Sequence, residues 1–178
     1  AGARFDYQKG KWFNHEYLMA TDDAVLAELF KPVLAEHVDV AQFSDEYIAE
    51  AVGTVKNRIN FVKDLWTNAA FYFQAPVEYA PKDVKKRWKE DTPKLMGELI
   101  TVLEGIADFS DAAATEATVM AWIKGNEYHM GNVMNAFRLT VVGECKGPHM
   151  FEITRLLGKE ETIARIKRGV EAIHLPNE

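Results

Sequence analysis

The chain has 178 residues, 48% of them hydrophobic, so it is long enough to bury a core without disulfides or metals. Its formal net charge is −6, with 21 lysines and arginines against 27 acidic residues, which argues mildly against nucleic-acid binding. A single cysteine, Cys145, excludes an intramolecular disulfide framework and favours a reducing, cytoplasmic compartment. Since no apolar run is long enough to cross a bilayer, we expect no membrane association.

Apolar residues recur at spacings of three and four along most of the chain, which predicts an all-helical protein. Thr21 is predicted to cap a helix that ends near Leu34, and Ser44 is predicted to cap the next one. A third helix is expected over residues 59–66, and the aromatic run at residues 71–73 is expected to end it.

Two prolines predict further helix starts, because Pro81 and Pro93 suit a first helical turn, where no N–H is needed. Thr92 is the predicted cap of the second of these helices, which should end near Gly105. The remaining helices are predicted from Ser110 or Asp111 to Gly125, from Met130 to Val141, from Phe151 to Leu157, and from Gly158 to Ile173.

The chain shows no internal repeat, and its helices suggest two small helical bundles that follow each other in the sequence. Two boundaries between them remain open, one in the segment Gln74–Ala80 and one at the turn Asp108–Asp111. Both segments interrupt the helical pattern with residues that favour turns.

Nothing in the chain predicts catalysis. The five histidines have no metal-ligand spacing, Cys145 has no recognisable activating base, and no phosphate-binding loop motif is present. We therefore predict no catalytic residue and no metal ligand. A small helical enzyme remains a weaker alternative, because no two convergent polar groups can be named for it.

Positive charge is concentrated in one short segment that contains Lys82, Lys85, Lys86, Arg87 and Lys89. Such a cluster is usually a solvated helix face, but its four lysines could equally contact the phosphates of a nucleic acid. The spacing does not decide between these two interpretations.

Three stretches of the chain resemble the bacterial glutamyl-tRNA synthetase family. They are Lys11–Leu18 (KWFNHEYL), Arg58–Trp66 (RINFVKDLW) together with the aromatic run at residues 71–73, and Asn135–Leu139 (NAFRL) with its continuation to Glu160. The catalytic motifs of that family, a His-x-Gly-His motif and a Lys-Met-Ser-Lys-Ser loop, do not occur in these residues.

The resemblance therefore implies the C-terminal, anticodon-binding fragment of such an enzyme. Residues 1–20 would end the stem-contact region, and residues 21–107 and 108–178 would form two helical anticodon-binding subdomains. The expected partners are tRNA(Glu) and the catalytic domain of the same chain. No cofactor is expected in this fragment, whereas ATP and magnesium would belong to the full-length enzyme. The protein is expected to be a monomer.

By the same resemblance, Arg58 corresponds to the arginine that reads the third anticodon base. Glutamate anticodons end in cytosine, which offers acceptors to a guanidinium, whereas glutamine anticodons end in guanine, which offers N–H donors. Such a contact would contribute about 1–3 kcal/mol of discrimination. Without the resemblance, Arg58 would be interpreted as a surface arginine that pairs with Asp64 or another nearby acid.

A second group of anticodon contacts is also implied by the resemblance. Arg138 corresponds to a family arginine near the anticodon loop, and the neighbouring turn corresponds to a loop that touches the bases: Lys146, Gly147, Pro148, His149 and Met150. Relatives carry a hydroxyl residue at the Gly147 position and glycine at the His149 position, so backbone contacts are expected from this loop. The competing interpretation of the whole chain is a helical protein-interaction module that does not bind RNA.

Overall fold

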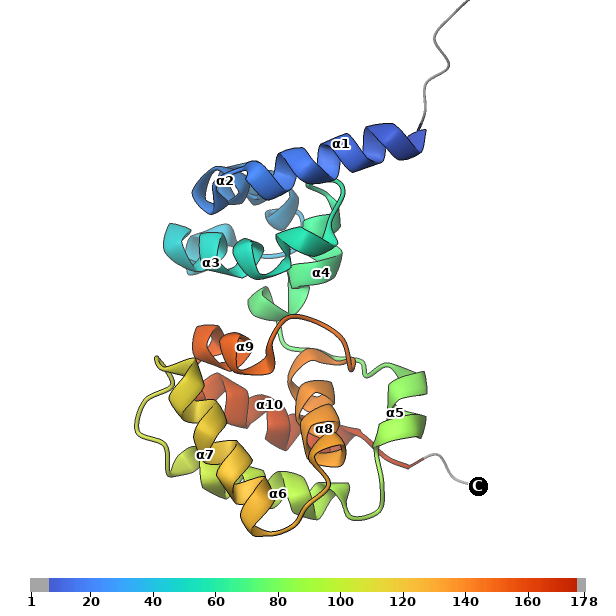
Figure 1. Cartoon of the computed structure of the whole chain (residues 1–178), viewed down its shortest axis with the longest axis vertical. Coiled ribbons are helices and arrows are strands. Elements are labelled where there is room, and N and C mark those ends of the chain that lie inside the picture. Colours follow the sequence, from blue (N-terminus) through green and yellow to red (C-terminus); the bar gives the residue numbers. More distant parts are fainter. Residues whose placement is uncertain (1–6, 176–178) are drawn as a thin grey trace, which may run out of the picture. The chain divides into compact units, whose positions relative to one another are not determined.

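The computed structural model describes residues 7–175. Within this range it contains ten α-helices, two short 3-10 helices and no strand, which confirms the all-helical prediction (Figure 1). Contacts within the chain define two compact units, Ala1–Gln74 and Ala75–Glu178. The break between them lies at the segment Gln74–Ala80. The predicted subdomain division between residues 107 and 108 falls inside the second unit and stays a prediction.

The first unit is built around α2 and α3, which pack against each other, with α4 against α3. Its fully buried core includes Leu26, Phe30, Ile48 and Leu65. The elements of this unit are α1 (Tyr7–Ala20), α2 (Asp23–Leu34), η1 (Val40–Gln42), α3 (Asp45–Val55), η2 (Lys56–Arg58) and α4 (Asp64–Phe73).

Helix caps in the first unit agree only partly with the sequence. Ser44 caps α3 as predicted, since its hydroxyl accepts a hydrogen bond from the Tyr47 N–H at 3.1 Å. Thr21 does not cap α2, because the N-cap is Asp22 and the Thr21 hydroxyl donates to the Tyr17 carbonyl at 2.8 Å. Leu29 on α2 is 46% exposed, although Leu26 and Phe30 beside it are fully buried.

The predicted helix over residues 59–66 is wrong at both ends. Residues 59–63 are not helical, and α4 starts at Asp64 and continues through the aromatic run to Phe73. The run stays helical because its rings are part of the core: Phe73 packs edge-on against Phe43, with ring centroids 5.0 Å apart, and against Tyr47 at 5.9 Å. Tertiary packing thus outweighs the low helix propensity of aromatic residues.

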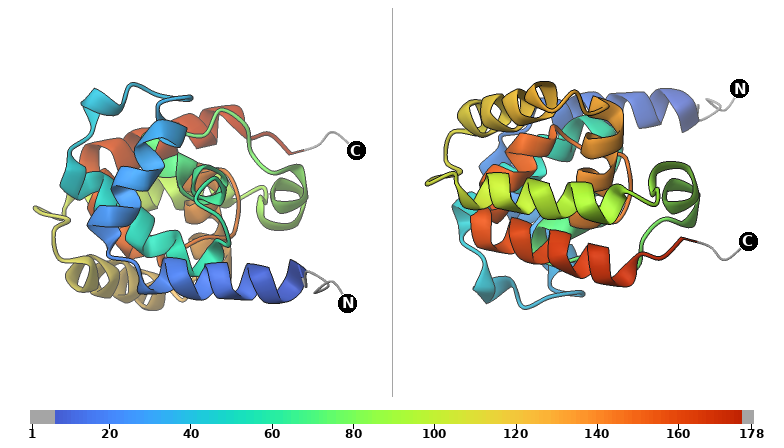
Figure 2. Two further views of the ribbon diagram at one scale, coloured as in Figure 1. Left: turned by 90° about the horizontal axis from the view of Figure 1, so that it is seen from above. Right: turned by 90° about the horizontal axis from the view of Figure 1, so that it is seen from below.

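The second unit is a bundle in which α6, α8 and α10 contact one another, and α6 and α10 lie side by side (Figure 2). Its core includes Met96, Leu99, Phe137, Phe151 and Ile166, all at most 1% exposed. The helices are α5 (Pro81–Arg87), α6 (Thr92–Glu104), α7 (Ala112–Gly125), α8 (Met130–Val142), α9 (Met150–Leu157) and α10 (Lys159–Ala172).

Helix starts in the second unit follow the predictions closely. Pro81 and Pro93 lie in first turns, and Asp111 caps α7 by accepting from the Ala114 N–H at 3.0 Å. The cap predicted at Thr92 is wrong by one residue. Thr92 is already helical, and its hydroxyl accepts from the Lys89 N–H at 2.8 Å.

Helix α8 is fixed against α10 by a close approach at Gly169. A Cβ atom at this position would lie 2.6 Å from the Thr140 side chain, so a larger residue would push the two helices apart. Next to this contact, the buried Arg165 donates to the Val141 carbonyl at 3.0 Å and to Glu161 at 2.7 Å. These contacts hold α8, the helix that carries Arg138, in one position.

Candidate functional site

Arg58 lies at the end of η2, directly after the core helix α3, and it is exposed. It borders a surface cavity of about 360 Å³ in the first unit. The cavity is lined by Gln8, Lys11, Trp12, His15, Asn57, Arg58 and Asn60. None of these lining residues is acidic, so the cavity is suited to an electron-rich or anionic ligand group.

The backbone that follows Arg58 is held by three side chains from two helices. The His15 Nδ1 donates to the Ile59 carbonyl at 2.6 Å, and the Asn14 amide donates to the Asn60 carbonyl. The Asp64 carboxylate accepts from the N–H groups of Asn60 and Phe61 at 3.1 and 2.9 Å. Because the Ile59 side chain is also fully buried, this segment has little freedom to move.

Helix α1 supplies the part of this cavity that the sequence did not predict. The Trp12 side chain is 57% exposed, and Lys11 and Gln8 line the cavity with it. Residues 7–20 lack a regular apolar stripe, so their periodicity did not predict a helix. The Lys11–Leu18 stretch that carries the resemblance was the one signal that could have pointed to these residues.

The cavity lining contains both hydrogen-bonding groups and an aromatic ring. The Arg58 guanidinium has five N–H donors, the amides of Asn57 and Asn60 offer donors and acceptors, and the indole of Trp12 offers a flat apolar surface. Proteins that recognise unpaired bases combine these two elements, hydrogen bonds to the base edge and stacking on an aromatic ring.

In the second unit, the structure brings Arg138 and the predicted loop together. Gly147 has a φ of +140°, and a Cβ atom there would lie 3.1 Å from the Arg138 Nη1. The guanidinium therefore lies against the loop backbone, and only glycine fits this position without strain.

The loop after α8 is anchored by three hydrogen bonds. The Gly143 carbonyl accepts from the Ala80 N–H at 2.8 Å, and the Cys145 N–H donates to the Asp83 carboxylate at 2.8 Å. The Cys145 thiol donates to the Asn135 carbonyl at 3.5 Å. The loop thus presents a fixed shape before any ligand arrives.

The predicted loop residues differ in what they can offer a ligand. The side chains of Pro148 and Met150 are buried and fix the loop, whereas Lys146 and His149 are exposed. Lys146 lies 3.2 Å from Glu144, and His149 lies 3.5 Å from Glu116. Any side-chain contact from the loop would therefore come from Lys146 or His149.

The four lysines predicted as phosphate contacts are all exposed: Lys82, Lys85, Lys86 and Lys89. Within residues 7–175, the structure shows no ion pair for any of them. Helix α5 carries Lys82, Lys85 and Lys86, and Lys89 follows it. The helix is anchored by Trp88, which is only 2% exposed, and by the hydrogen bond between Asp83 and the Cys145 N–H. Four ammonium groups are thus available to an anionic ligand.

Two further results concern other kinds of site. Burial, together with the nearby Asp83 carboxylate, raises the pKa of the Cys145 thiol to about 11, so the thiolate needed for nucleophilic chemistry is scarce at neutral pH. Among the described residues, no three histidine, cysteine or acidic side chains are grouped so that they could hold a metal ion. In the same part of the chain, no helix is both long and apolar enough to span a membrane.

Comparison with known proteins agrees with this geometry. The model of the anticodon binding domain family matches residues 25–170. The chain is 54% identical to the glutamate–tRNA ligase of Porphyromonas gingivalis and 57% identical to that of Bacteroides fragilis, over 173 residues in each case. Each alignment covers 97% of this chain but 34% of the relative, so the chain spans about a third of the length of these relatives.

Solved structures give the same result. The chain superposes on a glutamate tRNA ligase from Elizabethkingia meningosepticum with a TM-score of 0.87 and 36% identity, and on the enzyme from Elizabethkingia anophelis with a TM-score of 0.82 and 37% identity. These matches cover 98% and 97% of this chain and about a third of each enzyme. The chain therefore belongs to the glutamate–tRNA ligase family and carries its anticodon-binding domain.

Proposed function

We propose that this chain reads the anticodon of tRNA(Glu) for a glutamate–tRNA ligase. The observation that carries the proposal is the exposed Arg58 in a cavity whose described lining residues include no acid, where the backbone after the arginine is held by His15, Asn14 and Asp64. The held backbone fixes the point from which the Arg58 side chain can reach the edge of one base.

The proposed ligand of the Arg58 cavity is the third anticodon base. Cytosine turns its N3 and O2 acceptors to the guanidinium, whereas guanine turns N1–H and N2–H donors to the same group and leaves them unpaired. Trp12 would stack on the base from the side of α1. This arrangement favours glutamate tRNA over glutamine tRNA by about tenfold to a hundredfold, the range expected for a good base-edge contact.

Arg138 and the loop at residues 146–150 are proposed to contact the other anticodon bases. The support is the contact of the guanidinium with Gly147, together with the exposed side chains of Lys146 and His149. Pro148 and Met150 would act by fixing the loop and not by direct side-chain contact, because both are buried.

The remaining parts of the proposal concern the whole enzyme. As in its relatives, the anticodon-binding part would act with a catalytic domain of the same chain, which attaches glutamate to tRNA with ATP and magnesium. Residues 21–107 and 108–178 would be its two anticodon-binding subdomains, preceded by the end of the stem-contact region in residues 1–20. We further propose that the protein is a monomer and that it is cytoplasmic; the single cysteine, which favours a reducing compartment, supports the location.

Titration with RNA hairpins tests the proposal. The ligands are a glutamate anticodon stem-loop and its variant with guanine at the third anticodon base, at low and moderate salt. We expect the parent to prefer cytosine and Arg58→Gln to lose this preference. Lys63→Gln removes an exposed positive charge five residues from Arg58, and this variant should keep the preference for cytosine. Equal affinity of the parent for both hairpins would contradict anticodon reading through Arg58.

A further inference from the structure

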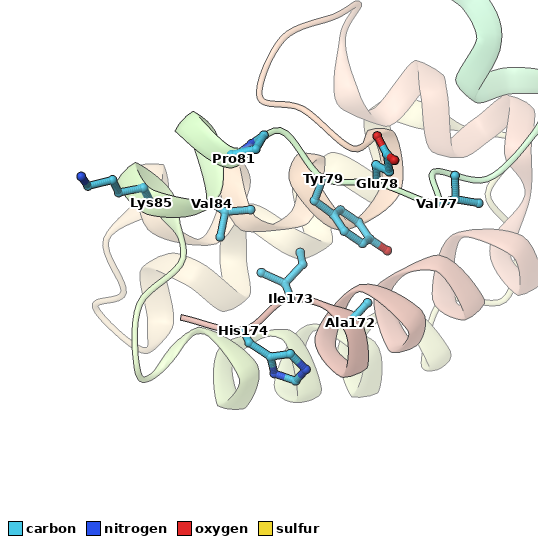
Figure 3. Close-up of a pocket in the computed structure, with 9 residues that line it drawn as sticks. All are labelled: Val77, Glu78, Tyr79, Pro81, Val84, Lys85, Ala172, Ile173 and His174. Atoms are coloured by element: carbon cyan, nitrogen blue, oxygen red, sulfur yellow. The ribbon is translucent and has the colours of Figure 1, made fainter. Parts of the chain in front are cut away.

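A second cavity, of about 510 Å³, lies in the second unit between the segment before α5 and the end of α10 (Figure 3). It is lined by Val77, Glu78, Tyr79, Pro81, Val84, Lys85, Ala172, Ile173 and His174. None of these residues is a predicted anticodon contact. Lys85 is a predicted phosphate contact. The volume is in the range of cavities that bind small organic molecules, about 300–1,000 Å³.

The walls of this cavity are mainly apolar, with one aromatic ring. The Tyr79 ring points towards Ala172 and Ile173, and Val84 lies across from it (Figure 3). Burial raises the pKa of Tyr79, whereas the nearby charges of Arg168 and Arg165 lower it. The phenol therefore stays protonated near neutral pH and can both donate and accept a hydrogen bond.

Polar groups lie around these apolar walls. Lys85 lines the cavity, and its side chain extends away from Ile173, so its ammonium points outward from the cavity (Figure 3). Glu78 and His174 complete the polar lining. A carboxylate such as that of Glu78 accepts hydrogen bonds from the amino groups of adenine, cytosine or guanine, so its presence is compatible with a base.

Positive charge continues from Lys85 along α5 and just beyond its end. Lys82, Lys86 and Lys89 are exposed like Lys85, and the nearest acid in the helix, Asp83, accepts a hydrogen bond from the Cys145 N–H. The same hydrogen bond joins α5 to the loop that lies against Arg138. The lysines therefore continue the proposed RNA-binding surface of this unit towards the cavity.

We propose that this cavity binds the base of an unpaired RNA nucleotide, stacked against the Tyr79 ring, while Lys85 and its neighbours hold the adjoining phosphates. A flat apolar site bordered by phosphate-binding cations is the arrangement that single-stranded nucleic acids require. An acidic peptide would satisfy the lysines but would leave the aromatic wall without a flat ligand. This inference rests on the proposed function, since it adds a nucleotide site to a tRNA-binding chain.

Filling the cavity tests the inference. Ala172 is exposed at the edge of the cavity, so Ala172→Phe occupies the space without removing a core contact or a charge. Ala121→Phe, at an exposed position on α7 of the same unit, is the matched control. With a glutamate tRNA transcript as the probe, we expect Ala172→Phe to weaken binding about tenfold, the loss typical of one stacked base, and the control to stay within about twofold.

A charge variant provides a second, independent measurement. Lys85→Gln should reduce the slope of log affinity against log salt by about 0.7–0.9, the value for one lost phosphate contact. Lys124→Gln, at an exposed position on α7, should leave the slope unchanged. An unchanged slope in Lys85→Gln would contradict the phosphate part of the inference.

The two proposals fail in different ways. If the parent prefers the cytosine hairpin but Ala172→Phe binds the tRNA transcript like its control, only the nucleotide site is overturned. If the parent binds no tRNA, both proposals are overturned. If polyglutamate binds the parent and Ala172→Phe abolishes this binding, while tRNA binding is unaffected, the cavity belongs to an acidic protein partner and the inference is wrong.

Discussion

At the scale of single residues, the proposed anticodon contacts depend on neighbours that never touch the base. Arg58 has a long, flexible side chain, and the position of the adjoining backbone determines which base the side chain can reach. Asp64 holds this backbone by accepting from two N–H groups, and His15 holds it from α1. We therefore regard Asp64 and His15 as positioning residues for Arg58.

Replacing Asp64 should test this role. Asp64→Ala leaves the N–H groups of Asn60 and Phe61 without their acceptor, which should lower the free energy of unfolding by about 1–3 kcal/mol. The preference for the cytosine hairpin should decrease although Arg58 is still present. Urea denaturation and hairpin titration measure the two effects. Asp45→Ala, which removes an exposed partner of Lys31, is the control and should keep the preference.

Gly147 is the second position where one atom decides the local geometry. Gly147→Ala should destabilise the protein by about 1–2 kcal/mol, because L-residues disfavour positive φ and the new methyl group would press on Arg138. Gly97→Ala is the matched control. A Cβ atom at Gly97 meets nothing within 4 Å inside helix α6, so this change should stabilise by about 0.5–1 kcal/mol. Equal effects of the two variants in urea denaturation would contradict the argument.

At the scale of helices, the sequence predicted where most elements lie but not where each begins. Ser44, Asp111, Pro81 and Pro93 occupy the helix starts expected of them. Capping chemistry is local, so it can be read from a few residues. The N-cap of α2 is Asp22 and not Thr21, because the Thr21 hydroxyl donates to the Tyr17 carbonyl of the preceding helix α1. Periodicity did not predict α1, so this hydrogen bond could not be foreseen.

The candidate site was predictable to a similar degree. Arg58, Arg138 and the loop are candidates by resemblance and stay predictions, and the structure brings Arg138 and Gly147 together. Trp12 could not be placed beside Arg58 from the sequence, because 46 residues separate them and their proximity depends on how α1 packs against η2. The burial of Pro148 and Met150 likewise follows from tertiary packing.

The helix caps predicted at Thr21 and Ser44 allow a test at this scale. Ser44→Ala removes the acceptor for the Tyr47 N–H and should cost about 1 kcal/mol of stability, the usual value for a helix cap. Thr21→Ala removes only a hydrogen bond to the Tyr17 carbonyl at an exposed position, so its cost should stay below about 0.5 kcal/mol. Thermal or urea denaturation measures both variants. A larger loss for Thr21→Ala would contradict the assignment of the caps.

At the scale of the whole molecule, the proposed contact with the third anticodon base and the proposed phosphate contacts lie in different compact units. The first unit carries Arg58 and its cavity, and the second carries Arg138, the loop and the lysines of α5. Each unit has its own fully buried residues, such as Phe30 and Ile48 in the first and Leu99 and Ile166 in the second. Base discrimination at the third anticodon position should therefore belong to one unit, and much of the salt-dependent affinity to the other.

Separate expression of residues 1–74 and 75–178 should divide these properties. The longer piece should unfold cooperatively in urea by itself, whereas the shorter piece should be less stable, since small domains bury a smaller share of their surface. The longer piece should bind both hairpins equally, with a steep dependence on salt from its lysines. The shorter piece should bind more weakly but prefer cytosine. If the preference is found instead in residues 75–178, Arg58 does not read the third base, because it is absent from that piece.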